Sequence, residues 1–198
     1  MEFKQFILKL SLQSRLCAFL FVAGILIKLT ISFSFSSTYT NNFFLPFVDY
    51  FISSGFSNPY QQFASGSIEI FPYPMLMLVI LSMPKILFSW VNASPELSIL
   101  IIKLPLLCAD IAIFYVLKSW LNHKHILKLI LLYWFSPVLI YISYIHGQLD
   151  AIPIALLFIS LYFLFHNSLK ASAVFLACSM ATKTVIVAIM PMLLIFLL

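Results

Sequence analysis

Three polar residues, His146, Gln148 and Asp150, interrupt the apolar sequence "YIHGQLDAIPIALLF" at residues 144–158. Polar side chains between two apolar runs are costly unless each has a partner. Asp150 has an ordinary explanation, because Asp150-Ala-Ile-Pro places an N-cap residue before a helix whose first turn tolerates proline. Capping does not account for His146 and Gln148, so these two residues indicate a polar site at this position.

A second carboxylate, Asp49, lies in "LPFVDYFISSGFSNPYQQFASG", a segment that contains no Lys or Arg. One interpretation is a turn or helix-capping aspartate. The alternative is a catalytic carboxylate, since long loops are often functional and partial desolvation among aromatic residues suits a general base. The aromatic residues of this loop, including Tyr50 and Tyr60, are typical of a membrane interface, where rings lie at headgroup level.

The composition predicts the environment of these residues. Of 198 residues, 63% are hydrophobic and only 9% are charged, whereas about a quarter of a soluble domain is charged. We therefore expect an all-α, polytopic transmembrane helix bundle. The three cysteines lie in apolar runs and have no metal or disulfide spacing, and the scattered basic residues, with a net charge of +5, argue against a nucleic-acid partner.

Five apolar stretches are candidate spans of a single transmembrane domain, given a rise of about 1.5 Å per residue and a hydrocarbon thickness of about 30 Å. They are residues 16–35, 97–117, 129–145, 149–165 and 171–198. We expect the first to be a retained span, because its apolar core is too long for a signal peptide, and its basic flank predicts a cytosolic amino end. The last is too long for one straight span, and we expect a break near Lys183 or Pro191.

A sixth stretch, residues 71–91, carries prolines at its start and a Pro84–Lys85 pair inside it. If it crosses, the loop with Lys118, Lys124 and Lys128 lies outside; if it does not, this basic loop is cytosolic. The tendency of basic loops to be cytosolic favours the second arrangement. We therefore predict a juxtamembrane or re-entrant helix, with the long loop 36–70 and the "HGQLD" loop both outside, so that Asp49 and Asp150 share one face of the membrane.

Charged residues inside the predicted spans need partners, because an ionisable group at bilayer depth is costly. Asp110 follows Lys103 by two helical turns on nearly the same face, which predicts either a structural Lys–Asp brace or a polar cavity lining. Lys183 lies about 18 Å along its helix from the cytosolic end, where it could face an outer cavity as a phosphate partner or pair with a carboxylate of another helix. Lys28 is shallower, and we expect it to snorkel.

The order of the motifs resembles a known family. A span is followed by an outer loop with a lone acid and "NPY", then "FPYP", "KLPLLCAD", "FSPVLIYISYIHGQLDAI" and "ATK…P". This order resembles the amino-terminal half of GT-C fold glycosyltransferases, in particular the mannosyltransferase-like enzymes that elongate glycolipids and GPI precursors, and their bacterial counterparts. The resemblance implies a transmembrane bundle with a long first extracytoplasmic loop, where a sugar passes from a polyprenyl-phosphate donor to a lipid-linked or glycan acceptor.

The resemblance also implies roles for the polar residues. Asp49 would act as base, and Asp150 would help to build the same site. Donor and phosphate binding would fall to Lys183, Lys103, His146 and Gln148, since cations stabilise developing phosphate charge. The remaining residues, Asp110, Tyr50 and Tyr60, would be structural or would line the cavity.

Two departures from the family pattern limit these expectations. Many relatives carry paired acids in the first loop, but this chain has only "VDY", so we predict no tightly bound metal or other cofactor and leave a loosely held divalent metal open. Relatives are usually much longer and this chain ends in an apolar run, so we expect it to be part of a longer protein. We place it in a bacterial cytoplasmic membrane rather than the endoplasmic reticulum.

The alternative functions come from other classes of protein. A transporter or channel component could use Lys103, Asp110, His146 and Lys183 as a polar path, since intramembrane ionisable groups are typical of proton relays. A non-catalytic scaffold in a larger membrane complex is the third interpretation.

Overall fold

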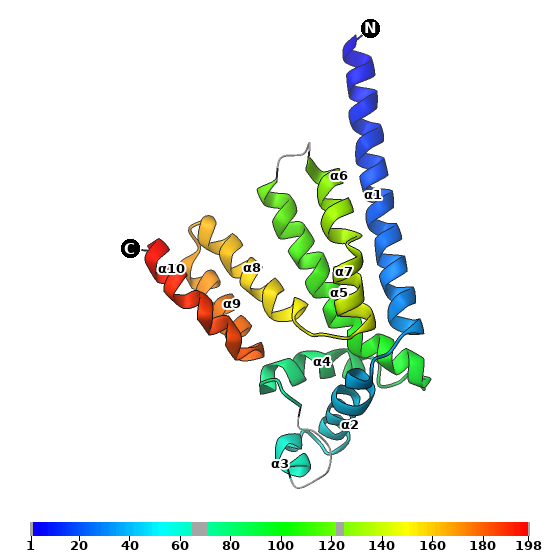
Figure 1. Cartoon of the computed structure of the whole chain (residues 1–198), viewed down its shortest axis with the longest axis vertical. Helices are drawn as coiled ribbons and strands as arrows, with labels where there is room; N and C mark the ends of the chain where they lie inside the picture. Colours follow the sequence, from blue (N-terminus) through cyan, green and yellow to red (C-terminus); the bar gives the residue numbers. More distant parts are fainter. Residues whose placement is uncertain (1, 65–70, 122–124, 198) are drawn as a thin grey trace.

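The computed structural model describes residues 2–64, 71–121 and 125–197. Throughout these ranges the chain is helical, with turns and short connections and without a β-strand (Figure 1). Lys124 of the predicted basic loop and residue 198 of the predicted last span lie outside the described residues. The prediction of an all-α protein is confirmed.

Two helices are long and apolar enough to cross a membrane. These are the Ser14–Ser34 part of α1 (Glu2–Ser34) and the whole of α5 (Pro95–Trp120). The start of α5 follows from its sequence: the Ser94 side chain accepts a hydrogen bond from the backbone N–H of Leu97, and Pro95 occupies the first turn, where a missing N–H costs nothing. These two helices support the prediction that the chain is a membrane protein.

A third candidate span is a bent pair of helical segments. The first segment joins α6 (Ile126–Leu129) to the π-helix η3 (Ile130–Trp134), and the second joins α7 (Pro137–Ile140) to the π-helix η4 (Tyr141–Ile145). The two segments meet at an angle of 43°. Pro137 explains the break, because it has no N–H to continue the helix. The predicted span 129–145 is therefore interrupted rather than straight.

In the described residues between α1 and α5, the structure has four short elements. They are the π-helix η1 (Thr40–Phe44), α2 (Leu45–Ser53), α3 (Pro59–Phe63) and α4 (Met75–Leu87). In Figure 1, α1 ends and α5 begins near these elements, and α4 runs across the direction of α5. This arrangement is the one expected if residues 71–91 do not cross the membrane, and the 13 residues of α4 are fewer than the roughly 20 that a span needs.

The last part of the chain is a hairpin of α8 (Ala151–Phe165) and α9 (Leu169–Thr182). Small hydroxyl residues join the two helices: the Ser160 Oγ donates to the Ser172 carbonyl at 2.8 Å, and the Ser179 Oγ donates to the Pro153 carbonyl at 2.7 Å. Both helices are shorter than the usual membrane span, so the count of five spans remains a prediction.

The predicted last span, 171–198, is not one helix. The α9 helix ends at Thr182, Lys183 is extended, and the chain continues as the 3₁₀-helix η5 (Thr184–Ile189) and α10 (Met190–Leu197). The break that the sequence predicts near Lys183 is therefore confirmed.

Two apolar cores hold the helices together. One lies where α2, α4, α5 and the start of α8 meet, and the other joins α1, α5 and both segments of the bent pair. Gly24 of α1 permits the second core, because a Cβ atom there would lie 2.1 Å from the Trp134 Nε1. That indole N–H donates to the Phe21 carbonyl at 3.1 Å, so α1 and the bent pair are in close contact.

Candidate functional site

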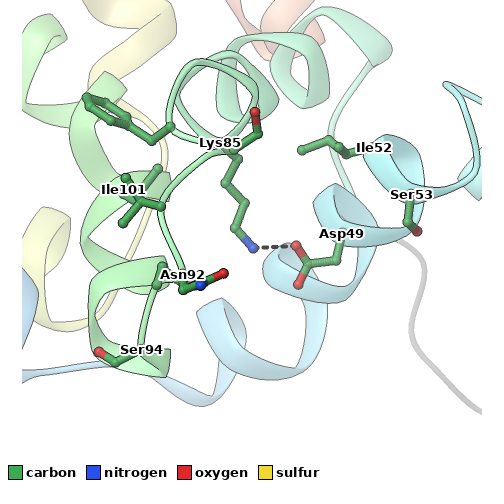
Figure 2. Close-up of a pocket in the computed structure, with 12 residues that line it drawn as sticks. Asp49, Ile52, Ser53, Lys85, Asn92, Ser94 and Ile101 are labelled. Atoms are coloured by element: carbon green, nitrogen blue, oxygen red, sulfur yellow. Dashed lines mark hydrogen bonds and ion pairs between the residues drawn. The ribbon is translucent and has the colours of Figure 1, made fainter.

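A pocket of about 760 Å³ opens between α2, α4 and the start of α5. Figure 2 shows Asp49 of α2 and Lys85 of α4 facing each other across it, with Asn92 and Ser94 of the α4–α5 connection nearby. The buried face of α2 consists of Phe47, Val48 and Phe51. Because residues two apart on a helix lie on different faces, Asp49 is turned away from that apolar core and toward the pocket. The lining comprises Asp49, Ile52, Ser53, Lys85, Phe88, Ser89, Val91, Asn92, Ala93, Ser94, Ser98 and Ile101.

Asp49 and Lys85 form an ion pair in which the Lys85 Nζ donates to the Asp49 Oδ1. The Asp49 side chain is 52% exposed and the Lys85 side chain is 17% exposed. Asp49 lies inside α2, whose N-cap is Phe44, so the capping interpretation is wrong. Its side chain remains half exposed, and neither Tyr50 nor Tyr60 lines the pocket with it.

Tyr50 and Tyr60 do not line the pocket. The Tyr60 hydroxyl donates to the Tyr73 carbonyl at 2.5 Å, and its ring contacts Phe47 edge-on. Burial raises the pKa of Tyr60 to about 12. In the "NPY" motif, the Asn58 side chain accepts from the Tyr60 N–H and begins α3. Tyr60 therefore has a structural contact, and the expectation that it lines a cavity is not met at this pocket.

The second predicted acid, Asp150, forms a separate ion pair with Lys183. Asp150 precedes α8, but its side chain makes no capping hydrogen bond, so the capping interpretation is wrong here too. The Lys183 Nζ lies 5.7 Å from the centre of the Tyr73 ring. Burial raises the pKa of Tyr73, and the negative charge of Asp150 raises it further. Of the two roles considered for Lys183, pairing with a carboxylate is the one observed.

The two acids do not share the predicted pocket. Asp150 is absent from the pocket lining. Lys85 occupies the last turn of α4, whereas Tyr73 precedes the first residue of that helix, and the ten residues between Met75 and Lys85 rise by about 15 Å. Asp49 and Asp150 thus belong to two ion pairs at opposite ends of α4.

Asp110 is the centre of a buried polar cluster. It accepts hydrogen bonds from the Lys28 Nζ at 2.6 Å, the Tyr133 hydroxyl at 2.6 Å and the Tyr144 hydroxyl at 2.8 Å. Lys28 is only 2% exposed and lies over the Trp134 ring, 3.3 Å from its centre. The expectation that Lys28 snorkels is therefore wrong, and Asp110 is paired with Lys28 rather than with Lys103 as predicted.

The spacing of Lys103 in the sequence indicates Asp110 as its partner, but Lys103 bonds to two backbone carbonyls instead. Its Nζ donates to the Phe35 carbonyl at 2.7 Å and to the Tyr144 carbonyl at 2.8 Å. No ion pair joins Lys103 to Asp110 among the described residues. Lys103 thus ties the residues after α1 to the end of the bent pair, and it does not line the pocket.

His146 and Gln148 also lie outside the pocket. The His146 ring stacks on Tyr39 with centres 5.4 Å apart, and its buried Nδ1 has no hydrogen-bond partner in the described part of the chain. Gly147 has φ +81°, and a Cβ atom there would lie 2.5 Å from the Thr40 Oγ1. The "HGQLD" loop therefore packs directly against the segment that follows α1.

Lys85 is the pocket residue that the sequence interpretation missed as a functional group. It is the only charged residue between positions 71 and 95. A single cation in an otherwise apolar helix was the signal that could have identified it. In the described ranges, no group of three or more His, Cys, Asp or Glu side chains is arranged to hold a metal ion.

Comparisons with protein-family models, curated proteins and solved structures find no match for this chain. The resemblance to GT-C glycosyltransferases therefore stays a prediction that rests on the motifs alone.

Proposed function

We propose that this chain forms the extracytoplasmic site of a GT-C type membrane glycosyltransferase. It would transfer a hexose, such as mannose, from a polyprenyl-phosphate donor to a lipid-linked or glycan acceptor. The observation that carries the proposal is the Asp49–Lys85 pair, which places a solvent-facing carboxylate and a cation at one pocket. Sugar transfer from a phosphate needs both groups, one for the incoming hydroxyl and one for the leaving phosphate.

The reaction is a displacement at the anomeric carbon of the donor sugar. The acceptor hydroxyl oxygen forms the new bond to this carbon while its proton passes to the Asp49 carboxylate. The bond between the anomeric carbon and the phosphate oxygen breaks, and the polyprenyl phosphate leaves with the electron pair. Lys85 stabilises the charge on that phosphate. Because Lys85 holds Asp49 in the free protein, binding of the donor phosphate would draw the cation away and release the carboxylate.

The exposed face of α4 supports a lipid-linked donor. Leu87 is 71% exposed, and Trp90, just beyond the helix, is 79% exposed. Phe88 lies between them and lines the pocket. Exposed apolar side chains of this kind suit a contact with lipid, and they would bring a polyprenyl chain next to Lys85.

The roles assigned from the sequence change accordingly. The phosphate role that the sequence assigned to Lys183 and Lys103 moves to Lys85, which is the cation of the pocket. Asp150 has no role in the pocket, since its pair with Lys183 contacts Tyr73 before the start of α4. His146 and Gln148 belong to a different surface.

The experiment is a transfer assay on the full-length protein in membranes, with a radiolabelled polyprenyl-phosphate mannose as donor. We expect Asp49→Asn to lower the rate by about 100-fold or more, the usual contribution of a general base. Asp150→Asn is the matched change in a carboxylate outside the pocket, and we expect it to retain most of the activity.

Two results would contradict the proposal. One is full activity in Asp49→Asn, and the other is a wild-type protein that uses no polyprenyl-phosphate sugar. The transporter alternative predicts the opposite order, in which Asp110→Asn abolishes function and Asp49→Asn has little effect. Protein levels in the membrane, measured for each variant, separate loss of activity from loss of insertion.

A further inference from the structure

We infer that residues 36–42 and 146–148, together with Tyr141, form a binding surface for an uncharged carbohydrate. We call this set the tyrosine–histidine surface. The inference rests on the proposed function for the choice of carbohydrate and goes beyond it, because this surface lies outside the pocket of Asp49 and Lys85.

Exposed aromatic rings are the first part of the argument. The Tyr39 ring stacks on His146 at 5.4 Å and 24°, and the Tyr141 ring meets His146 edge-on at 6.3 Å and 62°. Tyr39 is 51% exposed and Tyr141 is 54% exposed. The C–H groups on one face of a sugar ring pack well on such rings, because an aromatic face carries partial negative charge.

Neutral hydrogen-bonding groups surround these rings. The segment "SSTYTNN" at residues 36–42 consists of hydroxyl and amide side chains, of which Thr38, Asn41 and Asn42 are exposed, as is Gln148. No Asp, Glu, Lys or Arg occurs at residues 29–48 or 129–149. Amides and hydroxyls offer both donors and acceptors, which matches sugar hydroxyls. Without a cation, the surface has no partner for a phosphate, which distinguishes it from the pocket at Lys85.

The surface is held in a fixed arrangement by two buried contacts. Lys103 donates to the Phe35 carbonyl, just before residues 36–42, and to the Tyr144 carbonyl, just before residues 146–148. Gly147 lies against Thr40, in a space that no side chain could share. A surface built in advance loses less conformational entropy when it binds a ligand.

His146 supplies a further indication of a ligand. Its Nδ1 is buried and lacks a hydrogen-bond partner within the described residues, which is an uncommon state for a polar atom in a folded protein. Because a ring nitrogen of histidine either donates or accepts a hydrogen bond, a sugar hydroxyl is a chemically suitable partner for this atom.

An ordinary aromatic belt at the membrane surface is the competing explanation for Tyr39 and Tyr141. A belt requires only amphipathic rings at headgroup level. It does not depend on Gln148 or on a histidine between the tyrosines, so the two explanations differ in the effect of Gln148.

The test uses the full-length protein in lipid nanodiscs, with mannobiose as the probe and no donor present. Ligand-observed NMR and calorimetry measure its binding. We expect Tyr39→Ala and Gln148→Ala each to weaken binding by about tenfold or more, while Tyr39→Phe, which keeps the ring, binds within about threefold of the wild type. Tyr115→Ala is the matched control, because this tyrosine of α5 is 52% exposed but lies outside the surface.

The inference is overturned if the wild type does not bind mannobiose, or if Gln148→Ala binds as the wild type does. If Tyr39→Ala does not insert into the membrane, the comparison of Gln148→Ala with Tyr39→Phe decides the question. Because no donor is present, a protein that binds mannobiose but transfers no sugar would refute the proposed function alone.

Discussion

The buried pair of Lys28 and Asp110 allows a quantitative prediction. The Asp110 carboxylate accepts hydrogen bonds from three donors, and the Lys28 cation contacts both this carboxylate and the Trp134 ring. Lys28→Met leaves a buried carboxylate with only the hydroxyls of Tyr133 and Tyr144 as partners. Breaking a buried ion pair by removing one partner costs about 3–5 kcal/mol, and we expect this loss in the free energy of unfolding.

The reverse change is expected to cost less. Asp110→Asn leaves the Lys28 cation buried, but the Trp134 ring 3.3 Å away retains a cation–π contact worth about 2 kcal/mol when desolvated. The double variant, Lys28→Met with Asp110→Asn, contains no buried charge, and the Asn side chain still accepts from the tyrosines. We therefore expect the double variant to be more stable than Lys28→Met, and the two changes to be strongly non-additive.

The assay is reversible unfolding of the purified protein in mixed micelles, followed by helical circular dichroism. The exposed pair provides the matched control: Lys85→Met removes the cation from an ion pair whose carboxylate is half exposed, so we expect a loss of only about 0–1 kcal/mol. The reasoning is refuted if Lys28→Met costs no more than Lys85→Met, or if the effects of the two buried changes simply add.

Further predictions concern a glycine and a tyrosine. Gly147→Ala forces a side chain into φ +81° and against the Thr40 Oγ1, so we expect a loss of about 1–3 kcal/mol in the free energy of unfolding; Gly55→Ala, at φ +70° with no atom within 4 Å, isolates the backbone part and should cost less. Tyr60 should titrate near pH 12, because burial raises its pKa. The folded state then keeps a proton that the unfolded chain releases, so stability should fall as pH rises from about 10 to 12. An ultraviolet titration compared with Tyr60→Phe checks this, and an ordinary tyrosine pKa would contradict it.

The helices could be predicted from the sequence to different degrees. The predicted spans 16–35 and 97–117 correspond to parts of α1 and α5, with α1 ending one residue earlier at Ser34, because a long, predominantly apolar run is a local signal. The end of α9 at Lys183 was also expected. The 43° bend of the third candidate span was not expected, although Pro137 explains it, because proline has no N–H to continue a helix.

The ion pairs were harder to predict than the helices. Spacing within one helix proposed Lys103 as the partner of Asp110, but the observed partner is Lys28, which is 82 residues away in the chain. Lys85 and Asp49 are 36 residues apart. Periodicity reports which residues share a face of one helix, whereas pairing between helices depends on how the helices pack. Apart from Lys85, the polar residues of these pairs could be identified, but which residue pairs with which could not.

The α4 helix shows why hydropathy alone left the number of spans undecided. Met77, Leu78 and Leu81 are fully buried in the core shared with α2 and α5, whereas Met83 and Leu87 are exposed on another face. The high hydropathy of residues 71–91 therefore comes from two environments, a protein core and a surface suited to lipid. A helix that lies across the end of a bundle needs apolar residues on both faces, as a spanning helix does. The length of α4 distinguishes the two cases, because its 13 residues are fewer than the roughly 20 that a span needs.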